Sequence, residues 1–266
     1  MNKIIVRISE GLGNQLFMYA NAYALSEKTG YQLLIDNESA YFKSKDIRNY
    51  HLDNFNISGI LCKNEHRFNS HFKNLKRKFL IKTDIFKNKK LFLLEKKDKS
   101  KKTKYFEFSK NNFANLFYIE GHYESEKYFI KYKNELQNEF TLKNDHLYED
   151  NKYLDLIKKS QNVISICIRQ NRYSERSSNK FNLDNKIKSL DLTKKTLDYI
   201  KRAVNFTDNK FKNPKYLVWS NDFSNLRNYL PENKYIFVEN KMNKTLTDFY
   251  LLLNCKNFIV GPTSFH

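Results

Sequence analysis

The stretch that decides the fold is Ile4–Asp36, with the sequence IIVRISEGLGNQLFMYANAYALSEKTGYQLLID. Its first residues, Ile4–Ile8, form a β-branched run typical of a buried strand, and two glycines soon after break that run. Apolar residues then recur at helical spacing up to Gly30, where a left-handed helix stop fits, and Tyr31–Ile35 resumes as a strand. We therefore predict a strand, a glycine turn, a helix and a second strand in succession.

The turn contains Gly11, Gly13, Asn14 and Gln15. In open α/β sheets, ligands bind beyond the carboxyl ends of the strands, where the amides of a helix N-terminus point outward. Each of the two amide side chains both donates and accepts hydrogen bonds, which suits a ligand rich in hydroxyls or phosphate oxygens. An ordinary helix start capped by Asn14 explains the same residues, so the local sequence leaves both interpretations open.

Length and charge set the broad class of protein. The 266 residues can form one large or two modest domains, and we predict two. With 22 Phe and 18 Tyr there is ample material for packed cores, which excludes a wholly disordered chain. The net charge of +19 predicts attraction to phosphate-bearing partners, whether nucleic acid, anionic membrane or nucleotide.

The cysteines and the N-terminus indicate a cytoplasmic protein. Cys62, Cys167 and Cys255 are widely spaced, without a CxxC pair or grouped histidines, so we expect neither a zinc site nor a disulfide framework. Met1 leads almost directly into a strand without a leader segment. No apolar segment approaches the roughly twenty residues that a membrane span requires.

Lys73–Lys104 is the most basic part of the chain, and apolar residues such as Phe79 and Phe86 interrupt its lysines. The segment fits docking on an anionic membrane surface, which would place the protein at the inner face of the membrane. It also fits a solvated charged face on one or two helices. The preceding segment, Asn49–Ile57, fits either a strand or an extended loop.

The chain divides into two halves of similar pattern. A strand at Leu116–Glu120 and a second loop-to-helix unit ending near Phe140 close the first half. Lys143–Asp150 is polar and aperiodic, and we expect it to link domains spanning residues 1–150 and 151–266. In the second half we expect a doubly wound sheet with strands at 163–168, 216–219, 235–238 and 258–260, and helices at 154–159, 192–204, 223–229 and 247–253.

The strand Val163–Ile168 runs into a loop that carries three arginines, of which Arg169 is the first. Arginine at the carboxyl end of a parallel strand can hold a phosphate by forked hydrogen bonds, which lysine cannot reproduce. Surface pairing of these arginines with Glu175 is the alternative. A polar loop, Ser220–Asp222, follows the next expected strand.

The last expected strand runs into Gly261-Pro262-Thr263-Ser264. A glycine, a proline that fixes the turn and two hydroxyl residues predict a phosphate cradle at a helix N-terminus. The chain ends at His266, just where that helix would begin, so we expect a shortened form of a longer protein.

Several of these segments are similar to the motifs of a known protein family. The run GLGNQLFMYA at Gly11–Ala20, the segment LDNFNI at Leu52–Ile57 and Gly121-His122-Tyr123 resemble the family 11 α-1,2-fucosyltransferases, and the likeness covers nearly the whole chain. Cys167–Tyr173 aligns with the family's His-x-Arg-Arg-x-Asp-Tyr loop and retains its first arginine and its tyrosine, Arg169 and Tyr173. It departs from the family at three positions, which are Cys167, Gln170 and Arg172.

The resemblance implies a GT-B-like α/β architecture of two Rossmann-like domains facing a cleft. Residues 1–150 would form the acceptor-side domain, and residues 151–266 would bind the nucleotide sugar. The implied reaction moves L-fucose from GDP-fucose to the 2-hydroxyl of a β-galactoside, in a galactose-terminated surface glycan of a lipopolysaccharide or capsule. It would proceed with inversion, without a metal and without a cofactor.

Transfer from a nucleotide sugar develops negative charge on the departing diphosphate, which a guanidinium can stabilise selectively in the transition state. We expect Arg169 to have this catalytic role. For the base that deprotonates the acceptor we expect Glu10, which stands where the family generally has glycine, with Asp222 and Glu175 as further candidates. The expected substrate-binding residues are Gly11, Gly13, Asn14, Gln15, Asn171, Arg172, Ser220, Asp222, Thr263 and Ser264.

Three alternatives remain from the sequence. The altered arginine loop leaves open another nucleotide sugar as donor. A nicotinamide-dependent oxidoreductase is suggested by Gly11-x-Gly13 followed by Asp36, but Leu16 stands where the third glycine of that fingerprint belongs. A nucleic-acid-binding protein would fit the charge and the aromatic residues, but no RRM, KH or zinc motif supports it, and we expect no nucleic-acid partner.

Overall fold

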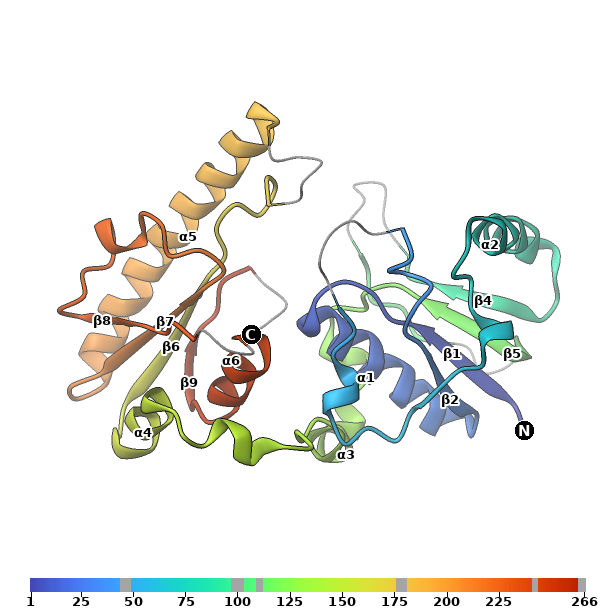
Figure 1. The fold of residues 1–266 in the computed structure, drawn as a ribbon, viewed down its shortest axis with the longest axis horizontal. Coiled ribbons are helices and arrows are strands. Elements are labelled where there is room, and N and C mark those ends of the chain that lie inside the picture. The colour runs from blue at the N-terminus through green and yellow to red at the C-terminus, as the bar shows by residue number, and fades with distance from the viewer. Residues whose placement is uncertain (44–48, 97–102, 109–111, 176–180, 241–243, 263–266) are drawn as a thin grey trace. The chain divides into compact units, whose positions relative to one another are not determined.

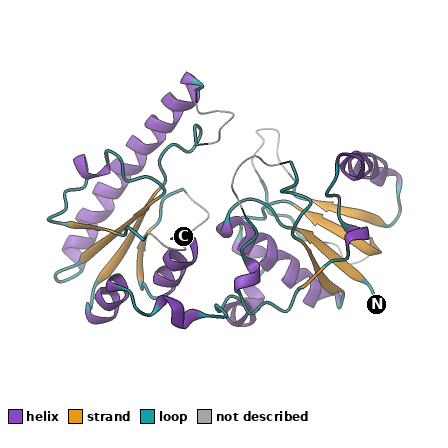
Figure 2. Ribbon diagram, viewed as in Figure 1, coloured by secondary structure: helices purple, strands orange, loops and turns teal. Residues whose placement is uncertain are grey.

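We describe the fold from a computed structural model, in which residues 1–43, 49–96, 103–108, 112–175, 181–240 and 244–262 are described. The chain divides into two compact units, Met1–Lys143 and a second unit that begins at Asn144 (Figure 1). The division falls at the start of the expected linker, where the described structure is a short 3-10 turn, Asp145–Tyr148. Each unit combines strands with covering helices (Figure 2). Within the described residues, no helix is both long enough and apolar enough to cross a membrane.

The first unit is built on a parallel sheet with the strand order β3-β2-β1-β5-β4 among the described residues. Along the chain, β2 and β3 are added on one side of β1, and β4 and β5 are then added on its other side. The connectivity therefore reverses between β1 and β5. Its strands are β1 (Lys3–Arg7), β2 (Gln32–Asp36), β3 (Ile60–Leu61), β4 (Lys90–Leu94) and β5 (Phe113–Glu120), and its helices are α1 (Leu12–Thr29), α2 (His71–Thr83) and α3 (Lys133–Glu139).

The predicted strand, turn, helix and strand at the N-terminus are confirmed. Gly30 has φ 71° and ends α1 in the left-handed conformation, and its N–H donates to the Ser26 carbonyl. Side chains alternate between the two faces of the sheet. Ile5 of β1 and Tyr118 of β5 are partners in the sheet register. Both belong to a buried hydrophobic cluster, against which Leu80 of α2 packs.

The second unit has a parallel sheet in the order β8-β7-β6-β9, and here the connectivity reverses between β6 and β9. The amphipathic helix α5 packs its buried Leu197, Ile200 and Val204 on one face, and α6 lies on the other side in Figure 1. The elements are α4 (Lys152–Lys159), β6 (Val163–Ile168), α5 (Leu183–Lys210), β7 (Lys215–Ser220), β8 (Tyr235–Phe237), α6 (Lys244–Leu253) and β9 (Asn257–Ile259).

Some expected elements are wrong. The helix expected at 223–229 is only a 3-10 turn, Leu226–Asn228, because Asn225 has φ 63°, a left-handed conformation that interrupts a helix. Asn49–Ile57, for which a strand and an extended loop were both open, is a loop that contains the 3-10 turn Leu52–Asn54. The short strand β3 and the edge strand β4, which lies inside the basic segment, were not predicted.

Candidate active site

Three loops meet at the carboxyl edge of the second sheet, because β6, β7 and β9 are parallel neighbours. They begin at Arg169, Asn221 and Val260. The β9 loop passes so close to β6 that a Cβ on Gly261 would lie 2.8 Å from the Cys167 carbonyl oxygen, so only glycine fits there. Arg172 joins the first and third loops by donating from Nη1 to the Pro262 carbonyl over 3.1 Å.

Gln170 fastens the β6 loop to the β7 loop. Its N–H donates to Asn221 Oδ1 at 2.8 Å, and its carbonyl accepts from Asn221 Nδ2 at 3.0 Å. Its Nε2 donates to the carbonyls of Asp222 at 2.6 Å and Ser224 at 2.8 Å. No local sequence pattern predicts that this side-chain amide holds two loops together.

Asp222 is held by its own surroundings. Its Oδ2 accepts from Asn171 Nδ2 at 3.0 Å and its Oδ1 from the Ser224 N–H at 2.8 Å. Hydrogen bonds from Ser224 hold the pKa of Asp222 below its ordinary value, which makes the carboxylate a poor proton acceptor. Ser220 Oγ donates to the Asp222 carbonyl at 2.6 Å. These contacts give Asn171, Ser220 and Asp222 a part in positioning the loops.

Arg169, directly after β6, forms the ion pair with Glu175 that the sequence left as an alternative. Nε donates to Oε2 at 3.1 Å, and Nη2 donates to Oε1. The Arg169 side chain is 30% exposed and that of Glu175 20% exposed. A guanidinium carries five N–H groups, and Glu175 uses the edge formed by Nε and Nη2. The edge formed by Nη1 and Nη2 still has the fork geometry that suits a phosphate.

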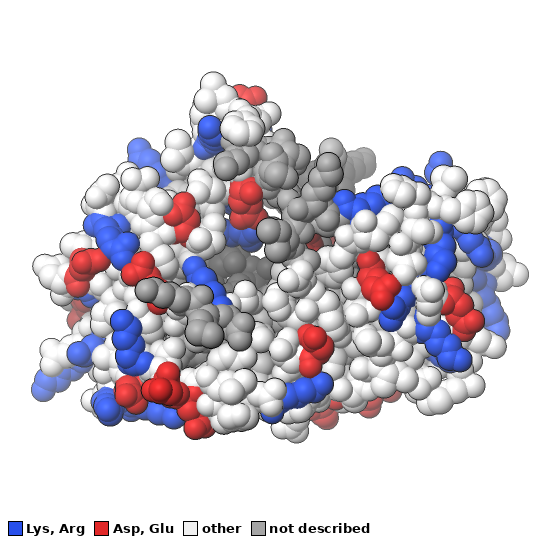
Figure 3. Space-filling view, in the orientation of Figure 1, with Lys and Arg blue, Asp and Glu red and all other residues white. Residues whose placement is uncertain are grey.

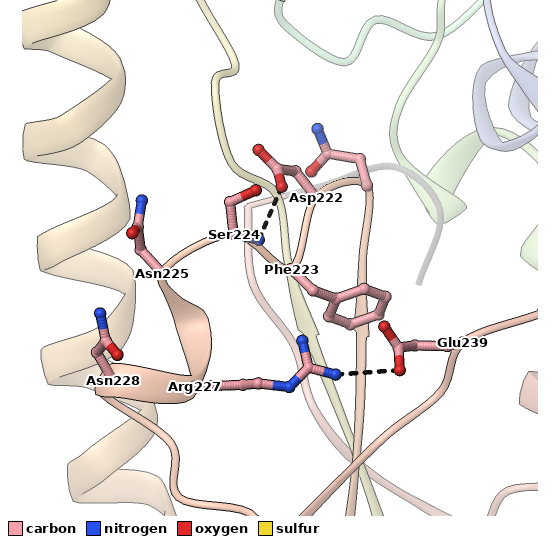
Figure 4. A pocket seen from close by; sticks show the side chains of 8 residues that line it. Asp222, Phe223, Ser224, Asn225, Arg227, Asn228 and Glu239 are labelled. Carbon is pink, nitrogen blue, oxygen red and sulfur yellow. Dashed lines mark hydrogen bonds and ion pairs between the residues drawn. The ribbon is translucent and has the colours of Figure 1, made fainter.

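A polar pocket of about 660 Å³ adjoins these loops (Figure 4). In it, Arg227 pairs with Glu239 over 3.0 Å and lies 4.7 Å from the centre of the Phe237 ring. Beside it, Lys244 Nζ donates to the Ser220 carbonyl at 2.8 Å. Neither Arg227 nor Lys244 was predicted as a site residue, although each lies in a segment that follows an expected strand. The pocket is lined by Asn221, Asp222, Phe223, Ser224, Asn225, Arg227, Asn228 and Glu239.

In the first unit, Gln15 holds the glycine turn in place. It is 0% exposed, and the two N–H groups of its Nε2 are shared among three acceptors, which are the Asn49 carbonyl at 2.8 Å, the Glu10 carbonyl at 2.9 Å and the Tyr41 hydroxyl at 3.1 Å. Its Oε1 accepts from the His51 N–H at 2.9 Å. The direct substrate contact expected of Gln15 does not fit this burial, so the residue positions the turn instead.

The other turn residues differ from Gln15. Gly11 is the N-cap of α1, with no side-chain cap, so Asn14 does not cap the helix. A Cβ on Gly11 would meet no atom within 4 Å, and its φ of −81° suits any residue. Asn14 Oδ1 is buried without a hydrogen-bond partner among the described residues, and Gly13 is buried in the first turn of the helix. Neither packing nor backbone geometry requires glycine at position 11.

Glu10 has φ 64°, in the left-handed region that favours glycine. Its carbonyl is fixed by hydrogen bonds from Gln15 and from the Tyr41 hydroxyl, the latter 3.1 Å long. The backbone at position 10 is therefore one that glycine adopts more readily than glutamate does. The Glu10 side chain is partly exposed at the carboxyl end of β1.

Charged residues also meet where the connectivity of the first sheet reverses. Arg7 at the end of β1 lies 3.9 Å from Glu120 at the end of β5, and Arg77 of α2 lies 3.4 Å from the same carboxylate. Burial raises the pKa of Glu120, although both arginines oppose that shift. None of these three residues was predicted as a site residue. The remaining expected residues, Thr263 and Ser264, lie outside the described residues.

Two Rossmann-like units, each with a parallel sheet and polar loops at the point where its connectivity reverses, define a GT-B-like fold. A solved structure supports this class. The chain matches the crystal structure of NodZ α-1,6-fucosyltransferase soaked with GDP-fucose at a TM-score of 0.52 and 12% identity, over 100% of this chain and 90% of that one. The prediction of a GT-B-like α/β fold is confirmed.

The chain belongs to glycosyl transferase family 11, whose model matches residues 3–266. An α-1,2-colitosyltransferase of Escherichia coli is 28% identical over 100% of this chain and 86% of that protein. The O-antigen biosynthesis glycosyltransferase WbnK of Escherichia coli is 23% identical over 97% of this chain and 86% of that protein. The protein is therefore a glycosyltransferase of family 11, the family that the resemblance indicated.

Proposed function

We propose that the protein transfers L-fucose, or another deoxy sugar carried by GDP, to the 2-hydroxyl of a β-galactoside in a surface glycan. The reaction would invert the anomeric carbon and need no metal ion. Relatives named for colitose transfer and O-antigen biosynthesis support a deoxy-sugar donor and a glycan acceptor. The second unit would hold the nucleotide sugar and the first unit the acceptor.

The observation that carries the proposal is the position of Arg169 at the carboxyl end of β6, at the reversal point with β9. Ligands of open α/β sheets bind at such points. Charge on the diphosphate increases as the bond to the sugar breaks, so a fork oriented in advance by Glu175 stabilises the transition state more than the ground state. The amides of the loop at Gly261 would add neutral donors to the same phosphates.

The pocket beside the arginine loop supports a nucleoside ligand. A guanine base presents both N–H donors and acceptors, and the lining offers the amides of Asn225 and Asn228 together with the carboxylate of Glu239. The Phe223 side chain provides an apolar surface in the same lining. The lining is therefore mostly polar with one aromatic ring, which suits the hydrogen-bonding edge and the flat face of a nucleobase.

For the acceptor, the glycine turn of the first unit supports binding of a hydroxyl-rich ligand. The open space over Gly11 lets a sugar approach the backbone closely. The buried Asn14 Oδ1, which has no partner among the described residues, can accept a hydrogen bond from a sugar hydroxyl. Glu10 is the carboxylate on this turn, and we assign it the base that takes the acceptor proton. Asp222 is less suitable because its lowered pKa weakens it as a base.

The direct test is a donor screen with a β-galactoside acceptor and product mass as the readout. GDP-fucose, GDP-colitose, GDP-mannose and UDP-galactose are compared at equal concentration. We expect transfer from GDP-fucose or GDP-colitose and none from the UDP sugar. Transfer from UDP-galactose alone would overturn the proposed donor, and linkage analysis of the product would test the 2-hydroxyl assignment.

A second measurement needs no acceptor. A ligand that prefers the folded state raises the melting temperature, so GDP should raise it and NAD should not. An equal rise with NAD would contradict a GDP-sugar site and favour a dinucleotide ligand.

A further inference from the structure

Helix α2 presents an apolar stripe to solvent. Phe72, Leu75 and Phe79, three and four residues apart, lie on one side of the helix and are 79%, 65% and 65% exposed. Ile85 and Phe86 in the turn after the helix are 70% and 83% exposed. Large side chains so fully exposed and so close together are unusual on a soluble surface, and they mark an interaction site.

The stripe is not the inner face of a poorly docked helix. The opposite side of α2 is fastened to the first unit, where Leu80 and Ile81 pack against the core. Arg77 reaches Glu120 over 3.4 Å, and Lys73 Nζ donates to the Asn64 carbonyl at 3.1 Å. Because the inner face already has its partners, the outward direction of the stripe is fixed by the fold.

The surface around the stripe is basic. Between His71 and Leu94 the sequence contains a single acidic residue, Asp84. That carboxylate is 5% exposed and accepts the N–H groups of Leu91 and Phe92 at 2.8 and 3.0 Å, so it adds little negative charge to the surface. Figure 3 shows Lys and Arg side chains gathered over this part of the first unit. The exposed lysines beside the stripe are Lys76, Lys78, Lys82, Lys87 and Lys89.

We propose that α2 docks the protein on an anionic lipid bilayer, with the stripe inserted among the acyl chains and the lysines at the headgroups. A helix with an apolar side flanked by lysines lies in the plane of the membrane interface, and anionic lipids attract such basic segments. Such a membrane matches both features of α2, since its acyl chains take up the apolar side chains and its anionic headgroups pair with the lysines.

Other occupants satisfy only part of this pattern. Nucleic acid would pair with the lysines and stack on phenylalanines, but it gives no partner to Leu75 and Ile85. A second copy of the chain could cover the stripe, but it would bring two sets of lysines together. A lipid surface accounts for both the exposed apolar side chains and the surrounding lysines.

The chain contains a natural control in α5. Leu183, Ile187 and Leu190 are 69%, 56% and 69% exposed, at the same helical spacing. Asp184 and Asp191 stand among them, so this stripe lacks the uniform positive charge of α2. It should not bind an anionic surface.

The test is cosedimentation of the full chain with phosphatidylcholine vesicles, with and without phosphatidylglycerol. Binding should require phosphatidylglycerol and weaken with salt. The triple variant Phe72→Ser, Leu75→Ser, Phe79→Ser should lose at least about tenfold in partitioning, as should Lys76→Gln, Lys78→Gln, Lys82→Gln. The matched variant Leu183→Ser, Ile187→Ser, Leu190→Ser should bind as the unsubstituted protein does.

Circular dichroism would establish that each variant is folded. The proposal is overturned if the α2 variants bind vesicles normally or if the α5 variant loses as much. It is also overturned if an oligonucleotide binds more tightly than the vesicles, or if the stripe instead forms a dimer that the α2 substitutions dissolve. Vesicle binding uses no donor or acceptor sugar, so its failure would leave the proposed transferase reaction untouched.

Discussion

Arg169 and Glu175 form a two-point ion pair at the carboxyl end of β6, with Nε donating to Oε2 at 3.1 Å and Nη2 donating to Oε1. The carboxylate fixes the plane of the guanidinium before any ligand arrives. Orientation in advance is valuable because a transition-state donor then needs no reorganisation at the moment of reaction. In the proposed reaction, Glu175 is therefore a positioning residue and Arg169 the group that contacts the diphosphate.

Two substitutions of Arg169 should distinguish the effect of its positive charge from the effect of its planar, forked shape. We expect Arg169→Ala to lower catalytic efficiency by roughly a hundredfold or more, as for loss of one strong transition-state donor. Arg169→Lys should restore little, because an ammonium keeps the charge without the planar fork. The measurement is GDP-sugar transfer kinetics together with circular dichroism.

The matched control for that experiment is Arg202→Ala, an exposed arginine on α5. It removes the same charge from the same unit and should leave kcat/KM nearly unchanged. A folded Arg169→Ala protein with normal turnover would refute the proposed role of the arginine.

Much of the fold was predictable because its signals are local. The strand Val163–Ile168 was predicted with the bounds that the structure has, since a short and almost entirely apolar run rich in isoleucine and valine is typical of a buried parallel strand. The helix α5 was predicted only from 192, because its first half, from Leu183, exposes its apolar side chains and lacks a core-facing pattern. β4 was not predicted, because it lies inside a lysine-rich segment whose overall composition suggested a charged surface. The short apolar run Leu91–Leu94 is the local signal for this strand.

The candidate site was less predictable because it depends on contacts between distant loops. The role proposed for Arg169 follows from its place after a strand, which the sequence shows. The clamp of Gln170 on Asn221 spans 51 residues, and no local pattern encodes it. Gln15 was expected to contact substrate, but its partners at Tyr41 and Asn49 come from a later segment and bury it.

Glu10→Gly tests the assigned base without disturbing the turn. Glycine adopts a positive φ at no steric cost, and that gain roughly offsets its greater entropy in the unfolded chain. We therefore expect the stability to change by less than about 1 kcal/mol, while transfer falls by about a hundredfold or more if the carboxylate takes the acceptor proton. Urea unfolding and initial rates give the two quantities.

Glu10→Gln is the companion variant, because it keeps the side-chain size and loses only the basic oxygen. If both variants turn over normally, Glu10 is not the base. If only the glycine variant is slow, the side chain binds the acceptor without accepting its proton.

Chelation should leave the reaction intact. In the proposed mechanism, the Arg169 fork supplies the positive charge that a divalent ion supplies in other transferases, and the loop amides add neutral hydrogen bonds. Transfer measured after dialysis against EDTA should therefore equal transfer with added magnesium or manganese. A loss of activity that either metal restores would show that a cation takes part.

The last prediction concerns Asp248, a buried carboxyl on α6 that is 6% exposed. Its Oδ1 accepts from Asn240 Nδ2 at 2.7 Å, yet burial raises its pKa from 3.8 to about 6. The folded protein therefore holds this proton more tightly than the unfolded chain does. Stability contributed by the protonated form is lost as the pH rises from about 4 to about 6, and the loss stays constant above that range.

Asp248→Asn removes this titration, and its carbonyl oxygen can still accept the hydrogen bond from Asn240. Relative to the unsubstituted protein, the variant should gain up to roughly 3 kcal/mol in the free energy of unfolding at neutral pH, a gain that disappears below about pH 4. Asp198→Asn, on the exposed surface of α5, is the matched control for the loss of one carboxylate. Urea unfolding of the three proteins across this pH range gives the comparison. A difference between Asp248→Asn and the parent that is the same at every pH would mean that Asp248 does not titrate as its burial implies.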